Sequence, residues 1–419
     1  MHIILYNIFL FFYKIGIRIA SLWDQKAKQW LEGRKDYFQK LQKTIISREK
    51  SIWVHCSSLG EYEQASPLLE KIRITYPSYK IFLTFFSPSG FEAKKNSPEV
   101  DYVFYLPLDS KKNARQLLDI INPVMVIFVK YEFWFHYLKK IKEKNIPLLL
   151  VSAIFRNNQP FFKWHGGLHR RMLLFFMRIF VQNEESKQLL EKIGISRTIT
   201  VAGDTRFDRV VEIAEKFIPV AGIARFAGPN KVIIAGSSWP DDEKMISRFI
   251  NINHSIACKW IVAPHEISKK HLQDLRELFP DSILYSELTD TTDQLNKNIL
   301  IINNIGMLSR LYKYATIAYI GGGFAKDGIH NTLEAAVYGK PIVFGPVYHQ
   351  FYEAQQLLMN QGAITVSDYN DFEVAIMKML KSDEIRIKMT EKSKTYVYEN
   401  KGASERIMRY IQENRLLTN

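Results

Sequence analysis

Two successive series of short apolar segments run through the 419-residue sequence. Within each segment Val, Ile, Leu and Phe follow one another without the polar alternation of a half-exposed strand. Such strands are buried on both faces, as in a parallel sheet that is covered by helices on each side. The first series comprises residues 52–54, 81–85, 103–105, 124–129, 148–151, 179–182 and 198–201. The second comprises residues 231–235, 260–263, 283–285, 299–302, 317–320, 341–344 and 363–366.

This repetition predicts a protein of the α/β class with two doubly wound domains. The segment 208–230 has few strand formers and is expected to link them. We expect an N-terminal membrane-anchor or interfacial helix over 1–35, a first domain over 36–215 and a second domain over 216–419. The helical pattern from residue 383 onward predicts final helices that pack back across the domains.

The formal net charge of +14 lies wholly in the first half of the chain. Residues 1–210 contain 33 Lys and Arg against 19 Asp and Glu, whereas residues 211–419 contain 24 of each. Solubility alone would not require this segregation. The N-terminal half is therefore expected to meet an anionic partner, such as nucleic acid, an anionic membrane or a phosphorylated substrate.

The N-terminal segment 1–23 is strongly apolar, but its uninterrupted core, 3–13, is shorter than the roughly 20 residues of a free-standing span. Basic residues follow this core, whereas they precede it in a cleaved signal peptide. Trp23 and the Lys and Arg residues flank the segment as interfacial anchors do. We expect an uncleaved anchor with a cytoplasmic basic flank or an amphipathic helix in the interface plane, the alternative being a buried N-terminal helix.

A second basic stretch, 155–180, interleaves cations with Phe, Trp, Leu and Met, and no acid occurs between Glu143 and Glu184. This pattern is typical of a surface that dips into lipid while its cations meet phosphates. Nucleic acid is an alternative because aromatics can stack on bases, but no nucleic-acid-binding signature accompanies the stretch. A partly buried helix with solvated arginines is a further alternative. The cations are Arg156, Lys163, Arg170, Arg171 and Arg178.

Charged side chains follow three of the predicted strands in the first half. Glu61 comes after the turn His-Cys-Ser-Ser-Leu-Gly and stands near the start of a predicted helix. There it can satisfy the helix dipole or act as a general base. Glu132 is a carboxylate among aromatics at a strand end, and Arg206 lies in the polar turn Gly-Asp-Thr-Arg-Phe-Asp.

The second half has glycine-rich turns after its strands. Gly321-Gly322-Gly323 follows one strand, and His330-Asn331-Thr332-Leu333-Glu334 is predicted to open a helix. Glycines let a backbone approach a phosphate, and a helix N-terminus supplies amide donors for it. The pattern is neither a P-loop nor GxGxxG, and no Asp-x-Asp, HExxH, CxxC or GxSxG occurs. We expect a metal-free reaction on an activated phosphate ester.

The motifs HCSSLGE, SPSGFE, KYEFW, GDTRFDR, the Pro-His pair and GGGFAKDGIHNTLEAA occur in this order and spacing. Together they resemble the 3-deoxy-D-manno-octulosonic acid (Kdo) transferases of lipid A biosynthesis, glycosyltransferase family 30. The resemblance implies a GT-B fold of two Rossmann-like domains facing across a cleft. It also implies inverting transfer of Kdo from CMP-Kdo to lipid IVA, an anionic glycolipid, with no metal or other cofactor. It places the enzyme at the bacterial inner membrane, with its catalytic domains on the cytoplasmic face.

On this resemblance Glu61 is the general base, and Glu132 and Arg206 stabilise the transition state. The CMP site maps to Pro264, His265, Ile305, Gly306, Met307, Asn331, Thr332, Leu333 and Glu334.

Three departures from the family pattern are visible. The family often has Arg where this chain has His265, commonly has Lys at Arg206, and often has Thr-His near Ser238-Trp239. One alternative is another membrane-associated GT-B transferase that uses a different nucleotide sugar. A second is a membrane-docked binding protein for nucleotide or nucleic acid that has no catalytic activity.

Overall fold

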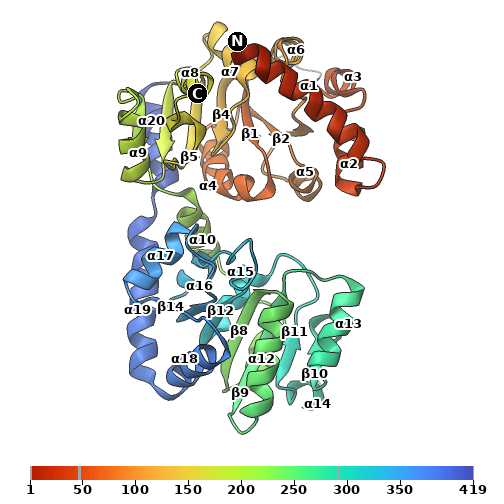
Figure 1. The fold of residues 1–419 in the computed structure, drawn as a ribbon, viewed down its shortest axis with the longest axis vertical. Coiled ribbons are helices and arrows are strands. Elements are labelled where there is room, and N and C mark those ends of the chain that lie inside the picture. Colours follow the sequence, from red (N-terminus) through yellow and green to blue (C-terminus); the bar gives the residue numbers. More distant parts are fainter. Residues whose placement is uncertain (1, 46–48, 290–291, 419) are drawn as a thin grey trace. The chain divides into compact units, whose positions relative to one another are not determined.

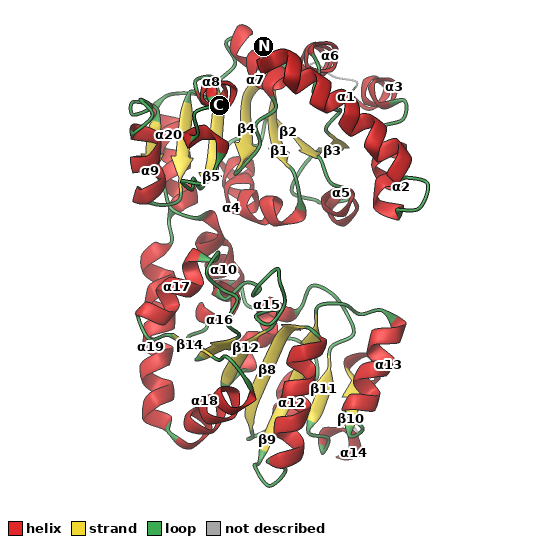
Figure 2. Ribbon diagram, viewed as in Figure 1, coloured by secondary structure: helices red, strands yellow, loops and turns green. Residues whose placement is uncertain are grey.

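The computed structural model describes residues 2–45, 49–289 and 292–418. The chain forms two compact units (Figure 1). Unit 1 comprises Met1–Arg209 and Lys401–Asn419, and unit 2 comprises Val210–Asn400. Each unit is a sheet with helices on both faces (Figure 2).

The strands of unit 1 are β1 (Ser51–Cys56), β2 (Lys80–Phe85), β3 (Tyr102–Tyr105), β4 (Pro123–Val129), β5 (Leu148–Ala153), β6 (Arg178–Val181) and β7 (Ile199–Val201). Its helices are α1 (His2–Ala20), α2 (Gln25–Glu32), α3 (Tyr37–Thr44), α4 (Leu59–Thr75), α5 (Pro88–Lys94), α6 (Lys111–Ile121), α7 (Phe135–Glu143), η1 (Pro160–Phe162), α8 (Gly167–Leu173), α9 (Glu184–Glu191) and α20 (Ala403–Glu413).

The sheet of unit 1 is parallel, in the order β3-β2-β1-β4-β5-β6-β7. Successive residues of a strand point to opposite faces. Trp53 and Phe128 therefore join one core with α6 and α7, while Val54 and Ile127 join another with α4 and α20. Burial on both faces explains why the strands read as unbroken apolar runs, and the predicted doubly wound sheet is confirmed.

The strands of unit 2 are β8 (Lys231–Ser238), β9 (Cys258–Pro264), β10 (Ser282–Leu284), β11 (Ile299–Ile301), β12 (Ile317–Ile320), β13 (Ile342–Phe344) and β14 (Ala363–Thr365). Its helices are α11 (Ile223–Ala227), α12 (Pro240–Ile252), α13 (Lys269–Leu278), η2 (Tyr285–Glu287), α14 (Thr292–Leu295), α15 (Leu308–Leu311), η3 (Tyr312–Tyr314), α16 (Leu333–Ala336), α17 (Tyr352–Met359), α18 (Tyr369–Lys381) and α19 (Asp383–Asn400). Helix α10 (Thr205–Glu215) crosses the boundary between the units. The sheet is again parallel, in the order β10-β11-β9-β8-β12-β13-β14.

The ends of the two units differ from the expected ranges. The expected linker, 208–230, is largely helical because it contains most of α10 and all of α11. The last segment, 401–419, belongs to unit 1 and not to the second domain as the range 216–419 has it (Figure 1). The reason is apolar burial: Ile407 and Ile411 of α20 are fully buried in the core that α4 shares.

Helix α1 is fastened to unit 1 along one face. The Tyr6 hydroxyl donates to Asp109 Oδ2 at 2.8 Å, and Asn7 Oδ1 lies 2.7 Å from His136 Nε2. Leu10 on the same face is buried. By length and composition α1 can cross a membrane, with a mean hydropathy of 1.7. Its polar contacts also dock it to unit 1, and the rest of its surface is mostly exposed.

Candidate functional site

The site in unit 1 lies where the strand order reverses. In sheet 1 this point falls between β1 and β4, and ligands of open parallel sheets bind outside the carboxyl ends of the strands at such a point. The turn after β1 leads to Glu61, and the turn after β4 leads to Glu132. Two residues that are far apart in sequence thus belong to one edge of the sheet.

Glu61 occupies the first turn of α4. Its Oε2 accepts from the backbone N–H of Ser57 and, at 3.0 Å, from that of Ser58. The side chain therefore closes the N-terminus of the helix, as the dipole interpretation predicted. These same two donors fix the carboxylate at the carboxyl end of β1.

The pKa of Glu61 is raised to about 7. Burial is the main cause and the negative charge of Glu132 is the second, while the backbone donors and Lys130 oppose them. A carboxyl with this pKa is ionised in about half of the molecules at neutral pH. This is the range in which a general base works best, because it accepts a proton readily and still exists in its basic form.

Glu132 is buried and held by two ring donors. Its Oε2 lies 2.8 Å from His55 Nε2 and 2.6 Å from Trp134 Nε1. The other ring nitrogen of His55 lies 2.9 Å from Thr84 Oγ1, so β1, β2 and the turn after β4 are tied together. His55 and Trp134 were not among the predicted site residues. His55 opens the motif HCSSLGE and Trp134 closes the motif KYEFW, so both were within reach of the sequence, but only the sheet order shows that His55 meets Glu132.

The edge of unit 1 carries further charged groups around Tyr131. The Arg156 guanidinium bonds to the Tyr131 hydroxyl at 3.1 Å. Burial raises the pKa of Tyr131, the positive charges of Arg156 and Arg206 lower it, and the negative charge of Glu61 raises it. Because the charges of Arg156, Arg206 and Glu61 all act on this hydroxyl, the three side chains lie near one another. Arg206 is itself held by Asp204, with Nε 2.8 Å from Oδ2.

Two turns at this edge adopt left-handed backbone. Lys130 directly follows β4 with φ +65°, and Ser152 near the end of β5 has φ +53°. Non-glycine residues in this region are strained and cluster at functional sites. Ser152 Oγ lies 2.7 Å from Thr205 Oγ1, which links the end of β5 to the start of α10, the helix that carries Arg206.

The five cations of the predicted acceptor patch do not form one group. Arg156 follows β5, whereas Arg178 pairs with Leu149 near the start of that strand and so lies at the opposite edge of the sheet. Arg170 donates to the carbonyls of Phe161 and Lys163 at 3.0 and 2.9 Å, which fixes the turn before α8. Arg171 lies 5.8 Å from the ring centre of Phe135.

In unit 2 the strand order reverses between β8 and β12. Buried Asp242, in the first turn of α12, joins the two turns that follow these strands. Its Oδ2 accepts from the backbone N–H of Trp239 and of Gly322, both at 2.9 Å, and its Oδ1 accepts from the Tyr319 hydroxyl at 2.5 Å. The triple glycine is thus fixed by a carboxylate before any ligand arrives.

The glycines allow main chains to approach closely at this edge. A Cβ on Gly321 would lie 2.3 Å from the carbonyl oxygen of Ser237, and one on Gly323 would lie 2.5 Å from Cα of Gly345. Gly322 has φ +89°, and Ser237 has φ +53°. No larger residue fits these glycine positions unless the backbone shifts, which explains the glycine run that the sequence shows.

Three rings stack above these turns. His265 lies parallel to Trp239, with centroids 4.8 Å apart, and to His330, with centroids 4.5 Å apart. Trp239 Nε1 donates to His330 Nε2 at 3.1 Å. Burial and, secondly, His265 lower the pKa of His330 to about 4, so it is neutral near pH 7 and can accept this bond. Trp239 and His330 were missing from the predicted CMP contacts.

The remaining predicted CMP contacts lie at the same edge of unit 2. Asn331 Nδ2 donates to Glu334 Oε1 at 3.2 Å, and Asn331 Oδ1 accepts from the N–H of Leu333 at 3.1 Å. Thr332 and Leu333 are fully buried. The helix that these residues open, α16, runs only over Leu333–Ala336, and one turn carries a much smaller dipole than the expected helix.

The Ile305-Gly306-Met307 turn precedes α15. Ile305 is exposed, Gly306 has φ +93° and Met307 is buried. A Cβ on Gly236 at the end of β8 would lie 2.9 Å from Leu308, so this turn packs near the β8 edge. Pro264 ends β9 and is buried, while the His265 side chain is exposed.

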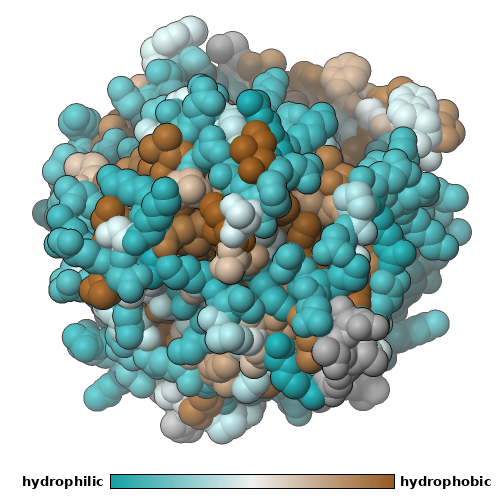
Figure 3. Space-filling model, turned by 90° about the horizontal axis from the view of Figure 1, so that it is seen from below, coloured by the Kyte–Doolittle hydropathy of each residue, from teal (hydrophilic) through white to brown (hydrophobic). Residues whose placement is uncertain are grey.

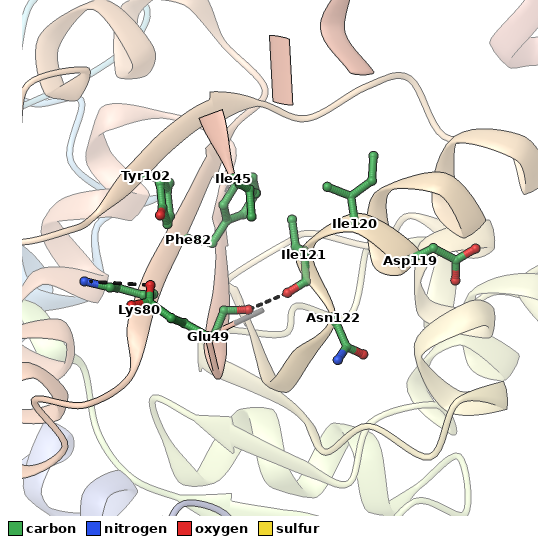
Figure 4. Close-up of a pocket in the computed structure, with 10 residues that line it drawn as sticks. Ile45, Glu49, Lys80, Phe82, Tyr102, Asp119, Ile120, Ile121 and Asn122 are labelled. Carbon is green, nitrogen blue, oxygen red and sulfur yellow. Dashed lines mark hydrogen bonds and ion pairs between the residues drawn. The ribbon is translucent and has the colours of Figure 1, made fainter. Parts of the chain in front are cut away.

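Unit 1 has a separate hollow of about 310 Å³ at the amino ends of its strands, lined by Ser51, Lys80 and Asp119 among others (Figure 4). Lys80 Nζ and Glu49 Oε2 form an ion pair at 4.0 Å there, and the Ser51 hydroxyl donates to the carbonyl of Ile121 at 2.7 Å. It lies at the edge of the sheet opposite to Glu61. Among the described residues, no three His, Cys, Asp or Glu side chains gather as a metal site requires.

Residues 29–209, most of unit 1, match the family model of the 3-Deoxy-D-manno-octulosonic-acid transferase (kdotransferase). The sequence is 25% identical over 365 residues to a Kdo transferase of Aquifex aeolicus, covering 86% of this chain and 94% of that relative. It is 24% identical over 423 residues to one from Rickettsia prowazekii, covering 97% and 87%. Unit 1 therefore matches the Kdo transferase family model, and most of the chain is similar to Kdo transferases.

A Fusobacterium nucleatum protein described as a bifunctional glycosyltransferase/methyltransferase is 25% identical over 391 residues. The match covers 89% of this chain but only 56% of that relative. This chain therefore spans little more than half of the length of the Fusobacterium protein.

Solved structures agree with the fold. A UDP-GlcNAc 2-epimerase from Neisseria meningitidis superposes with a TM-score of 0.62 at 16% identity, covering 87% of this chain and 100% of that one. A glycosyltransferase from Rickettsia africae gives 0.54 at 15% identity, covering 89% and 100%. At such identities the likeness concerns the fold alone, and that fold is GT-B, as predicted.

Proposed function

We propose that this protein is a Kdo transferase, which transfers Kdo from CMP-Kdo to a hydroxyl of lipid IVA in lipopolysaccharide biosynthesis. The observation that carries the proposal is Glu61, a carboxylate fixed at the switch point of unit 1 with its pKa raised to about 7. Transfer to a hydroxyl needs one group that removes a proton at the moment of attack. Glu61 has the position and the proton affinity for this task.

In the proposed reaction the acceptor hydroxyl oxygen attacks the anomeric carbon of Kdo. The bond from this carbon to the phosphate oxygen breaks, CMP leaves with the electron pair, and the hydroxyl proton passes to Glu61. Attack on the face opposite to CMP inverts the configuration. No oxidant, reductant or metal is required to balance the step.

Glu132 has a supporting role in this proposal. Its bonds to His55 and Trp134 hold a negative charge near Glu61, and that charge raises the proton affinity of the base. Arg206, which Asp204 holds in place, brings positive charge to the same neighbourhood and can offset the negative charge that develops in the transition state.

The donor nucleotide is assigned to the carboxyl edge of unit 2. The glycines bring buried main chains into close contact at this edge, and Asn331 bonds to Glu334, whose carboxylate is proposed to bind the hydroxyls of a ribose. The stack of Trp239, His265 and His330 offers a flat surface beside them.

The enzyme is further proposed to lie on the cytoplasmic face of the bacterial inner membrane. The exposed side of α1 carries large apolar side chains, and α8, which contacts α1, is followed by exposed Leu174. The face of the molecule in Figure 3 instead shows hydrophobic side chains scattered among hydrophilic ones. An apolar helix with basic neighbours suits an anionic membrane surface. The α1 side chains are Ile4, Leu5, Ile8, Phe9, Phe11 and Phe12.

The test is a micelle assay with CMP-Kdo generated in situ and tetraacylated, bisphosphorylated lipid A precursor, with products read by mass spectrometry and no added metal. Wild type is expected to add one Kdo or more. Glu61→Gln should lose about 10²–10⁴-fold in turnover, the usual contribution of a general base. Glu63→Gln, the same change on the same helix, is the control. Stronger competition by UDP than by CMP would favour a transferase that uses a different nucleotide sugar.

A further inference from the structure

A hollow of about 530 Å³ lies in unit 1 between helices α1, α2 and α3 and the loop after β3. Its walls are mainly apolar and include Leu31, Phe38 and Leu108. This volume falls within the roughly 300–1,000 Å³ of small-molecule sites. An apolar hollow of this size and shape is suited to a hydrocarbon chain.

Cations line the same hollow. Lys14 and Arg18 extend from α1, Lys35 follows α2, and all three are exposed. Glu32 is the one acid among the lining residues. An apolar floor with a cationic rim is complementary to an amphiphile that carries negative charge next to its hydrocarbon.

A second hollow, also of about 530 Å³, adjoins the first and shares Lys14 and Leu108 with it. It adds Lys111 and Lys112 from the start of α6. The two hollows therefore form one continuous region along the docked side of α1, with cations at both ends.

Aromatic rings connect this region to Glu132, whose charge acts on the proposed base. Trp30, which lines the first hollow, lies 5.6 Å from Phe86 between ring centres. Phe86 lies 4.8 Å from Trp134, whose Nε1 bonds to Glu132 at 2.6 Å. A hydrocarbon chain bound in the hollow would therefore place the polar head of its molecule near the carboxyl edge of the sheet.

We propose that this hollow binds an acyl chain of the glycolipid acceptor, with Lys14, Arg18 and Lys35 contacting an acceptor phosphate. The inference rests on the proposed function and adds to it where the lipid part of the acceptor lies. A bilayer phospholipid also has acyl chains and a phosphate, but only the acceptor has its sugar hydroxyls at the reacting edge. The ring contacts from Trp30 to Glu132 therefore favour the acceptor as the occupant.

The first experiment is photocrosslinking in mixed micelles that contain equal amounts of tetraacylated acceptor and phosphatidylglycerol. The photoreactive residue p-benzoylphenylalanine replaces Phe38 in the hollow or, as a control, Phe12 on the exposed face of α1. At position 38 the acceptor should be captured in preference to phosphatidylglycerol, and at position 12 both lipids should be captured. Equal capture at both positions, or capture of phosphatidylglycerol alone at 38, refutes the assignment.

The second experiment fills the hollow with Leu108→Trp and uses Ile74→Trp, at an exposed position of α4, as the control. Leu108→Trp should raise the KM for acylated acceptor by about tenfold, the loss for excluding about two methylenes, and leave the KM for CMP-Kdo unchanged. It should also reduce the crosslink at Phe38. An unchanged acceptor KM in a folded variant contradicts the proposal.

The experiments distinguish a failure of the proposed function from a failure of the proposed lipid site. If wild type captures the acceptor at Phe38 but transfers no Kdo, the proposed function is wrong and the lipid site stands. If it transfers Kdo but captures no acceptor at Phe38, the function stands and the lipid site is wrong.

Discussion

The pKa of Glu61 makes a quantitative prediction for turnover. If ionised Glu61 is the base, kcat/KM should fall on the acid side with an apparent pKa of about 7. The ionised fraction is then about 91% at pH 8 and about 9% at pH 6, a loss of roughly tenfold. A carboxyl at the ordinary value of 4.5 would still be about 97% ionised at pH 6 and would give almost no change.

Glu132→Gln tests the cause of this pKa. The substitution removes the like charge that raises the pKa of Glu61, while its amide oxygen can still accept from Trp134. The acid limb of kcat/KM should therefore move to lower pH, although it stays above 4.5 because burial is the larger cause. Glu63→Gln, which leaves Glu132 in place, should not move it. The measurement is kcat/KM for the acceptor from pH 5 to 9 under saturating CMP-Kdo.

The free energy of unfolding should also depend on the ionisation of Glu61, but in the opposite direction: kcat/KM rises with pH, whereas stability falls. A carboxyl whose folded pKa lies above its unfolded value stabilises the protein below the unfolded pKa and loses this contribution as pH rises through the folded one. Wild type should therefore lose stability between about pH 4.5 and 7 relative to Glu61→Gln. Denaturant midpoints at pH 5 and pH 8 measure this. An acid limb near pH 4.5, or no difference in the pH response of the two proteins, would refute the reasoning.

Three further predictions concern other contacts. Asp242→Ala leaves three donors without their carboxylate and should destabilise unit 2 by at least about 3 kcal/mol in denaturant unfolding. Gly323→Ala forces a methyl group against the main chain of Gly345 and should weaken CMP binding in calorimetry, whereas an unchanged affinity would mean that this turn does not hold the nucleotide. Tyr6→Phe removes the bond to Asp109 and should cost about 1 kcal/mol and speed proteolysis between α1 and α2; equal proteolysis would show that the bond does not fasten α1.

The fold was predictable because strands that are buried on both faces appear in the sequence as uninterrupted apolar segments. Segments such as 124–129 contain no polar residue, so they can only be strands or helices of an interior, and their length favours strands. The turn before Glu61 was predictable for a similar reason, since a helix start selects small and acidic residues.

The side-chain network of the site was not predictable in the same way. Trp134 lies only two residues after Glu132, but His55, the fifth residue of β1, is brought to Glu132 by the order of strands in the sheet. The helix that residues 330–334 open was predicted, but the short length of α16 was not. Its pattern marks where a helix begins, but Gly339, with φ +66°, follows soon after Ala336 and no helical pattern continues.

The return of the chain to unit 1 has a consequence for biosynthesis. Unit 2 is one continuous stretch, Val210–Asn400, whereas the core beside α4 includes Ile407 and Ile411. On the ribosome, the domain whose synthesis starts first must wait for the last residues before that core can close. Until then the apolar side of α4 lacks its cover, and a chain that stops near residue 400 would keep unit 2 whole while leaving unit 1 open.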